Sequence, residues 1–224
     1  MKKHLYILVI FILYVFISCS KNDKISLTEE YAFLKPNFES TVKVDFSKEG
    51  IDLIEDFENQ IQKDICQTTP FLNGEIVKNK EILSFPLIVY KYCGALAHFR
   101  NRIPIIISKK NEVLIDDQFI VQSNGIVKDY LIEATDYLIE TEKKKTIVYL
   151  LNWDEKADPI LITERLIEIL ESIKAYINQL SLNRYNKQIS ELNENELTEI
   201  KKDYNPLIGI EENIMVLDSP LPTE

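Results

Sequence analysis

The side chains best suited to chemistry surround the single tryptophan of the chain. Trp153, Asp154 and Glu155 stand together where a strongly apolar stretch ends. Two acids can act as the acid and base of glycoside hydrolysis, and α/β folds place ligand sites where their strands end. A turn that packs a tryptophan explains the same residues without any chemistry. We favour the turn and keep the three residues as a candidate interaction or site cluster.

Other catalytic and cofactor motifs are missing from the sequence. The five glycines are too scattered for a phosphate-binding loop, and neither HExxH nor a G-x-S-x-G elbow occurs. The chain has two histidines, and His98 stands in an apolar stretch, where a packing role is the common one. We therefore expect no cofactor and no metal, and favour a protein that is not an enzyme. A small hydrolase that uses carboxylates is the alternative.

The chain begins with a leader typical of bacterial lipoproteins. Two lysines precede the uncharged run 5–17, which is short for a membrane-spanning helix but fits the apolar part of a secretion signal. Phe16-Ile17-Ser18-Cys19 then resembles a lipobox, the pattern that ends in the lipid-carrying cysteine. We expect residues 1–18 to be a lipoprotein signal peptide and Cys19 to carry the lipid. A plain signal peptide or a short uncleaved anchor is the alternative.

The charge of the chain limits its partners. The formal net charge is −10 at pH 7. Loss of the leader would make the charge more negative, because the leader contains two lysines. This charge disfavours nucleic acid. It also disfavours anionic lipid headgroups, so attachment to a membrane must come from acyl chains. We expect a lipid-anchored protein of the bacterial cell envelope, with the outer membrane favoured over the inner, whose partner is an envelope protein or polymer.

Two further cysteines, Cys66 and Cys93, remain after Cys19 is assigned to the lipid. Disulfides persist in an oxidising compartment, so these two residues are a possible pair. Such a bridge would contribute about 3 kcal/mol to the free energy of unfolding. Cysteine is also a common buried hydrophobe. The sequence therefore does not decide whether the two cysteines form a disulfide or remain free thiols.

A domain with both helices and strands is predicted to follow a tether over residues 19–40. The region 41–100 has a strand-helix-strand pattern. Period-two alternation predicts a strand at 41–46, and apolar spacings of three and four predict a helix at 48–66. Residues 68–74 are predicted to form a loop because they contain proline and an Asn-Gly pair. A buried strand is expected near 86–93.

The region 101–204 has a sharper pattern, and residues 205–224 are predicted to be a tail. The predicted elements are a hairpin at 103–116, a helix at 126–140, a strand at 146–151 buried on both faces, a helix at 160–179 behind an Asp-Pro cap, a strand at 181–185, and a helix at 194–203 behind an Asn193–Glu196 capping box. This order predicts an α+β or α/β fold, in which amphipathic helices pack mainly on one face of a sheet.

The order of these elements resembles the periplasmic domain of the ExbD/TolR family of biopolymer-transport proteins. The matching stretches are 105–115, in the hairpin, and 146–154, which ends in Asp154 where the family's turn carries its aspartate. The resemblance implies an α/β domain that contacts partner proteins and the envelope. Family members also carry an aspartate in a membrane span for proton coupling. Residues 5–17 contain no acid, so the binding role alone would be shared.

Overall fold

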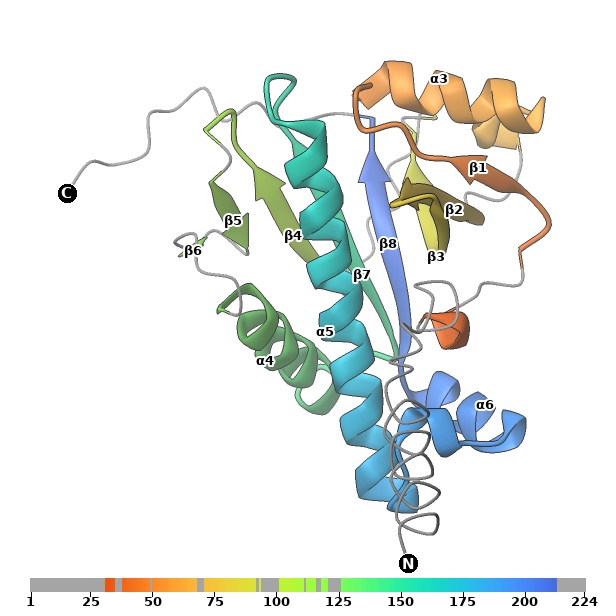
Figure 1. Cartoon of the computed structure of the whole chain (residues 1–224), viewed down its shortest axis with the longest axis vertical. Coiled ribbons are helices and arrows are strands. Elements are labelled where there is room, and N and C mark those ends of the chain that lie inside the picture. The colour runs from red at the N-terminus through yellow and green to blue at the C-terminus, as the bar shows by residue number, and fades with distance from the viewer. Residues whose placement is uncertain are drawn as a thin grey trace, which may run out of the picture.

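An eight-stranded mixed sheet forms the centre of the fold, with strand order β1-β2-β3-β8-β7-β4-β5-β6 (Figure 1). It is seen in a computed structural model that describes residues 31–34, 38–48, 50–67, 71–91, 93, 101–110, 112–115, 118–120 and 126–212. The strands are β1 (Thr41–Lys43), β2 (Phe71–Lys78), β3 (Glu81–Tyr90), β4 (Arg102–Ile107), β5 (Val113–Ile115), β6 (Gln118–Ile120), β7 (Thr146–Trp153) and β8 (Asn205–Glu211). The α-helices are α3 (Gly50–Ile61), α4 (Ile126–Glu140), α5 (Pro159–Tyr185) and α6 (Glu194–Asp203), with single 3₁₀ turns η1 (Ala32–Leu34), η2 (Ile65–Gln67) and η3 (Ile189–Glu191).

Four parallel strands make up the middle of the sheet. β8 pairs with β3 on one side and with β7 on the other, and β7 pairs with β4. β2 and β5 run antiparallel to the strands beside them in this central set. β8 therefore joins strands of the 41–100 and 101–204 regions. The carboxyl ends of the four strands meet at one edge, towards which the β8 arrow points in Figure 1.

The helices pack on one face of the sheet, which confirms the predicted fold class. Buried side chains of α3, α4 and α5 join Leu87, Tyr149 and Ile208 in one core, and α5 lies across the sheet with α4 beside it (Figure 1). On the opposite face, Ile88 and Val148 belong to a smaller buried cluster. β7 is thus buried on both faces, as its continuous apolar character predicts. Within the described ranges, no helix has both the length and the apolar character that a membrane crossing requires.

Helices with recognisable caps begin where the sequence predicts. Asp158 accepts a hydrogen bond from the Ile160 backbone N–H at 2.9 Å, and α5 starts with proline directly after it. Asn193 and Glu196 form the reciprocal capping box of α6, whose bounds match the prediction. These local hydrogen bonds determine the starts of both helices because they satisfy backbone donors that have no partner inside the helix.

Several predictions made from the sequence are wrong. Part of the predicted tether 19–40 belongs to the folded domain, because Tyr31 and Leu34 are buried in the main core. Residues 181–185 are the last turn of α5, because Ser181 is fully buried on the helix face that packs inward, and the helix ends only at the left-handed Asn186. Residues 205–211 of the predicted tail form the central strand β8, while residues 213–224 lie outside the described part. The predicted loop 68–74 contains the start of β2. The predicted helix 48–66 ends at Ile61, and η2 follows it.

A chain of three buried hydroxyl groups crosses the core. The Tyr149 hydroxyl lies 2.6 Å from the Thr135 hydroxyl and 2.6 Å from the Tyr204 hydroxyl, and the Thr135 hydroxyl donates to the Leu131 carbonyl oxygen at 2.6 Å. Burial raises the pKa of Tyr149 to about 12, against the lowering effect of its two hydroxyl partners. Each hydroxyl is paired, so these polar groups fit inside the apolar core.

Replacing Tyr149 by phenylalanine is expected to weaken the dependence of stability on alkaline pH. The pKa of Tyr149 is raised in the folded state, so its contribution is complete below about pH 10 and is lost as the pH rises towards 12. Between pH 9 and pH 11, urea unfolding should show a loss of free energy roughly 1 kcal/mol larger in the wild type than in Tyr149→Phe. Equal losses in both proteins would show that Tyr149 does not cause the alkaline effect.

Candidate functional site

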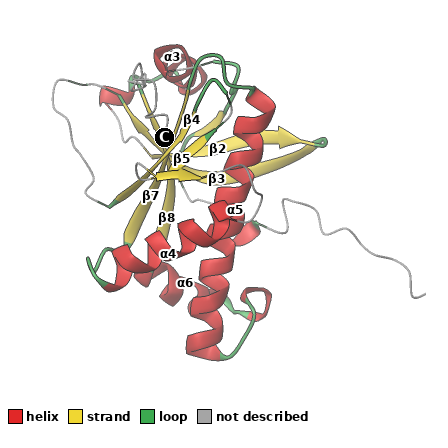
Figure 2. Ribbon diagram, turned by 90° about the vertical axis from the view of Figure 1, so that its left-hand side faces the viewer, coloured by secondary structure: helices red, strands yellow, loops and turns green. Residues whose placement is uncertain are grey.

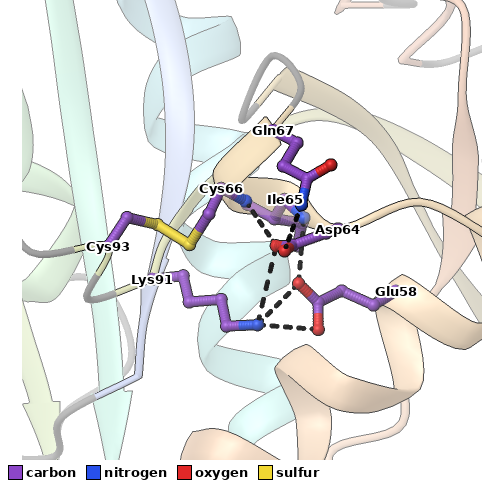
Figure 3. Close-up of a disulfide and its surroundings, with 7 residues drawn as sticks. All are labelled: Glu58, Asp64, Ile65, Cys66, Gln67, Lys91 and Cys93. Atoms are coloured by element: carbon purple, nitrogen blue, oxygen red, sulfur yellow. Dashed lines mark hydrogen bonds and ion pairs between the residues drawn. A yellow bond between two sulfur atoms is a disulfide. The ribbon is translucent and has the colours of Figure 1, made fainter.

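The carboxyl edge of the parallel strands carries a disulfide and a group of charged residues, which together we call the clasp: Glu58, Asp64, Cys66, Lys91 and Cys93 (Figure 3). Ligand sites of α/β proteins commonly lie at this edge. Cys66 belongs to η2, and Lys91 and Cys93 follow β3. The two cysteines form the disulfide that the sequence left open, with their Cα atoms 5.5 Å apart.

Glu58 is the central acceptor of the clasp. The Lys91 Nζ lies 2.7 Å and 2.8 Å from its two carboxylate oxygens, and the Ile65 backbone N–H donates to Oε1 at 2.9 Å. The Lys91 Nζ also lies 3.9 Å from Asp64, which accepts a hydrogen bond from the Cys66 backbone N–H at 2.8 Å. One carboxylate of α3 therefore holds both η2 and the end of β3, beside the covalent link.

The charges of the clasp keep Lys91 protonated. The hydrogen bond from Lys91 to Glu58 raises the pKa of the lysine most. Burial is the next largest effect and lowers the pKa, whereas the negative charges of Glu58, Asp64 and Glu212 each raise it, so that the pKa is raised overall. A protonated lysine is not a nucleophile, and both Glu58 oxygens already accept hydrogen bonds. The group in the clasp that can change covalently is therefore the disulfide.

An open groove of about 600 Å³ lies directly beside the clasp. Its lining contains amide groups and charges of both signs, from Glu58, Asn59, Gln62, Lys63, Asp64 and Lys91. Such a lining offers hydrogen-bond donors and acceptors to a polar group. The sequence did not reveal this arrangement, because Glu58 and Lys91 are 33 positions apart and no local pattern pairs them.

The cluster predicted around Trp153 forms a turn at the end of β7. The Trp153 side chain is buried, and its ring forms a T-shaped pair with the Phe46 ring at a centroid distance of 5.2 Å. Asp154 accepts a hydrogen bond from the Lys156 backbone N–H at 3.0 Å, and the Glu155 carboxylate lies 3.8 Å from the Lys156 Nζ. These are contacts of a turn that packs a tryptophan, and none of the three predicted residues lines the groove.

A second exposed feature lies near the end of the β2–β3 hairpin, which projects away from the rest of the sheet (Figure 2). Val77 and Ile82 are partners across the two strands, and 67% and 47% of their surfaces are exposed. They border a groove of about 280 Å³ whose other residues are Lys43, Val44, Asp45 and Glu75. Two exposed aliphatic side chains inside a charged rim have the composition of a small protein-binding surface.

The neighbouring edge strand β1 is protected against the addition of another strand. The Lys43 backbone N–H donates to Gln60 Oε1 at 2.7 Å, and Gln60 Nε2 donates to the Lys43 carbonyl oxygen at 3.0 Å. These are the backbone groups that an added strand would need. The Lys43 backbone is therefore not available to an added strand, and we expect a partner at this position to contact side chains of the hairpin instead.

Comparisons with known proteins give no relative for the chain. No model of a protein family matches it, and no significant match was found among curated proteins or solved structures. The resemblance to ExbD/TolR domains stays a prediction: the hairpin, helix, strand and long helix occur in the expected order, but α6 lies between the long helix and β8. Cys19 and His98 lie outside the described residues.

Proposed function

We propose that this protein is a lipid-anchored component of the bacterial cell envelope that binds another envelope protein or polymer and is not an enzyme. The observation that supports the location best is the Cys66–Cys93 disulfide, because such bonds persist outside the reducing cytosol. The lipobox-like residues that end at Cys19 agree with the same compartment. A leader and a disulfide are independent features, so their agreement strengthens the proposal.

The binding role is supported by the exposed pair on the β2–β3 hairpin. Val77 and Ile82 expose aliphatic surface at a projecting end of the domain, where packing does not need it. Charged residues surround this surface, as they surround the apolar centre of many transient interfaces. More specifically, we propose a binding role of the kind known for ExbD/TolR periplasmic domains.

Lipid attachment is expected to depend on Cys19. Cells that express the wild type and receive an alkyne analogue of a fatty acid should give a labelled protein, whereas Cys19→Ser should give none. The Cys66→Ser/Cys93→Ser variant serves as a matched control, since it removes the other two cysteines but keeps the lipobox-like residues, and it should label as the wild type does. Equal labelling of the wild type and Cys19→Ser would contradict the proposed anchor.

Charge on the hairpin is expected to prevent partner binding. A lipidated double variant, Val77→Asp with Ile82→Asp, should lose on the order of ten-fold in the yield of a specific cross-linked envelope product, since buried charge without a partner is costly at an interface. Ile160→Asp is the control, because Ile160 has 69% of its surface exposed but lies on α5. The same cross-linked yield from the hairpin variant and the wild type would contradict a hairpin-centred binding surface.

A further inference from the structure

We propose that the Cys66–Cys93 disulfide is a site of reversible thiol–disulfide exchange with a dithiol protein that presents a positively charged surface. Both cysteines lie among the exposed residues of the domain. Exposed disulfides are the ones that thiols reach, whereas structural disulfides of secreted proteins commonly resist reduction. Cys66 is in a single 3₁₀ turn and Cys93 lies beyond β3, so neither sulfur is enclosed by the sheet.

The exchange needs a reductant, which is the dithiol itself. A thiolate of the dithiol attacks one sulfur, so that a mixed disulfide forms and the other cysteine leaves as a thiolate that takes up a proton. The second thiol of the dithiol, after losing its proton, then breaks the mixed disulfide. Cys66 and Cys93 end as two thiols and the dithiol ends as a disulfide, so two electrons and two protons are transferred in total.

The domain keeps non-covalent links across this junction when the covalent link opens. Lys91 still binds both oxygens of Glu58, which still accepts from the Ile65 backbone N–H. Ile65 itself is buried, with 4% of its surface exposed. β3 stays paired with β2 and β8. The two thiols therefore remain near each other after reduction, which allows the bond to form again.

The charges around the disulfide select the attacking thiol. Three carboxylates, Glu58, Asp64 and Glu212, interact with Lys91 next to Cys93. Lys63 is a second cation in the lining of the groove, so among these described groups the acids outnumber the bases by three to two. The local field is therefore negative, so it repels an anionic thiol and attracts a cationic one. This identifies the partner by its chemistry, as a dithiol within a basic surface. The inference rests on the proposed envelope location for the compartment of the partner, but not for the exchange chemistry.

Purified protein can test the exchange with three small probes: dithiothreitol, cysteamine, which is cationic, and glutathione, which is anionic. Free thiols are counted by alkylation and mass spectrometry, while circular dichroism follows the fold. We expect dithiothreitol to reduce the disulfide fully without denaturant and without loss of secondary structure. Per thiolate at low salt, cysteamine should react on the order of ten times faster than glutathione, and 1 M salt should remove most of this difference.

Two variants assign the charge effect to the clasp. Glu58→Gln keeps an acceptor for the Ile65 backbone N–H but removes one negative charge, so it should reduce the ratio of the two rates. Glu164→Gln removes an exposed charge on α5 and should leave the ratio as in the wild type. A disulfide that resists all three thiols until denaturant is added, a fold that is lost on reduction, or equal rates at low salt would each overturn the inference. None of these results bears on the lipid anchor, which is tested separately by labelling.

Discussion

Replacing Ile208 by proline should abolish cooperative folding of the domain. Ile208 lies in β8 in register with Leu87 of β3 and Tyr149 of β7, and 1% of its surface is exposed. Proline removes a backbone donor from a strand that is paired on both sides, which a central strand does not tolerate. The loss should be at least about 3 kcal/mol. Urea unfolding followed by circular dichroism and by Trp153 fluorescence measures it.

Ile208→Val is the matched control for this prediction. It removes one methylene group from the same buried position but keeps the backbone donor, so it should cost about 1 kcal/mol and leave the unfolding cooperative. If Ile208→Pro unfolded at the same urea midpoint as Ile208→Val, this would contradict a β8 strand that is paired on both sides within the sheet. Loss of the Trp153 signal together with the helical signal is expected for proline, because β8 joins strands from both regions of the chain.

Removing the disulfide should lower the free energy of unfolding by roughly 3–4 kcal/mol, while the domain stays folded. Cys66 and Cys93 are 27 positions apart, and a link of this length restricts the unfolded chain by about that amount in the chain-entropy model. The Cys66→Ser/Cys93→Ser variant and the oxidised wild type are compared by urea unfolding. Fully reduced wild type is the control, because it has the same open junction and should match the variant. Unchanged stability of the variant would contradict a formed disulfide.

Elements that local signals define were predictable from the sequence. α4 and α6 have the predicted bounds, and α5 begins after its predicted cap at Asp158. A cap is a hydrogen bond between near neighbours, such as that from the Ile160 backbone N–H to Asp158, so its residues are visible in a short window. Continuous apolar character likewise identified β7, since a strand buried on both faces has no polar side.

Elements that depend on distant contacts were missed. β8 contains Pro206 and precedes further prolines, so only its pairing with β3 and β7 identifies it as a strand. β2 contains Asn73 and Gly74, a pair typical of turns. In the fold, Asn73 binds the Phe38 backbone, and a Cβ on Gly74 would lie 2.5 Å from the Phe85 ring. Contacts with residues distant in the sequence, Phe38 and Phe85, thus make the Asn-Gly pair compatible with a strand.

The candidate site was predictable only in part. The sequence offered Cys66 and Cys93 as a possible pair, because disulfide chemistry needs just two thiols. It did not indicate Glu58 or Lys91, whose ion pair depends on where α3 ends relative to β3. The carboxylates chosen beside Trp153 are explained by a turn, which uses the same residue types as a catalytic pair.

The central claim, a lipid-anchored protein of an oxidising compartment, is tested most directly by one mass spectrum. The protein is taken from its own cells after alkylation of free thiols before lysis, and its peptides are analysed without reduction. The proposal predicts an N-terminal peptide that begins at Cys19 with a diacylglyceryl group, together with a Cys66–Cys93 cross-linked peptide free of alkylation. A chain that retains residues 1–18, or that has no lipid on Cys19 and alkylated Cys66 and Cys93, would contradict it.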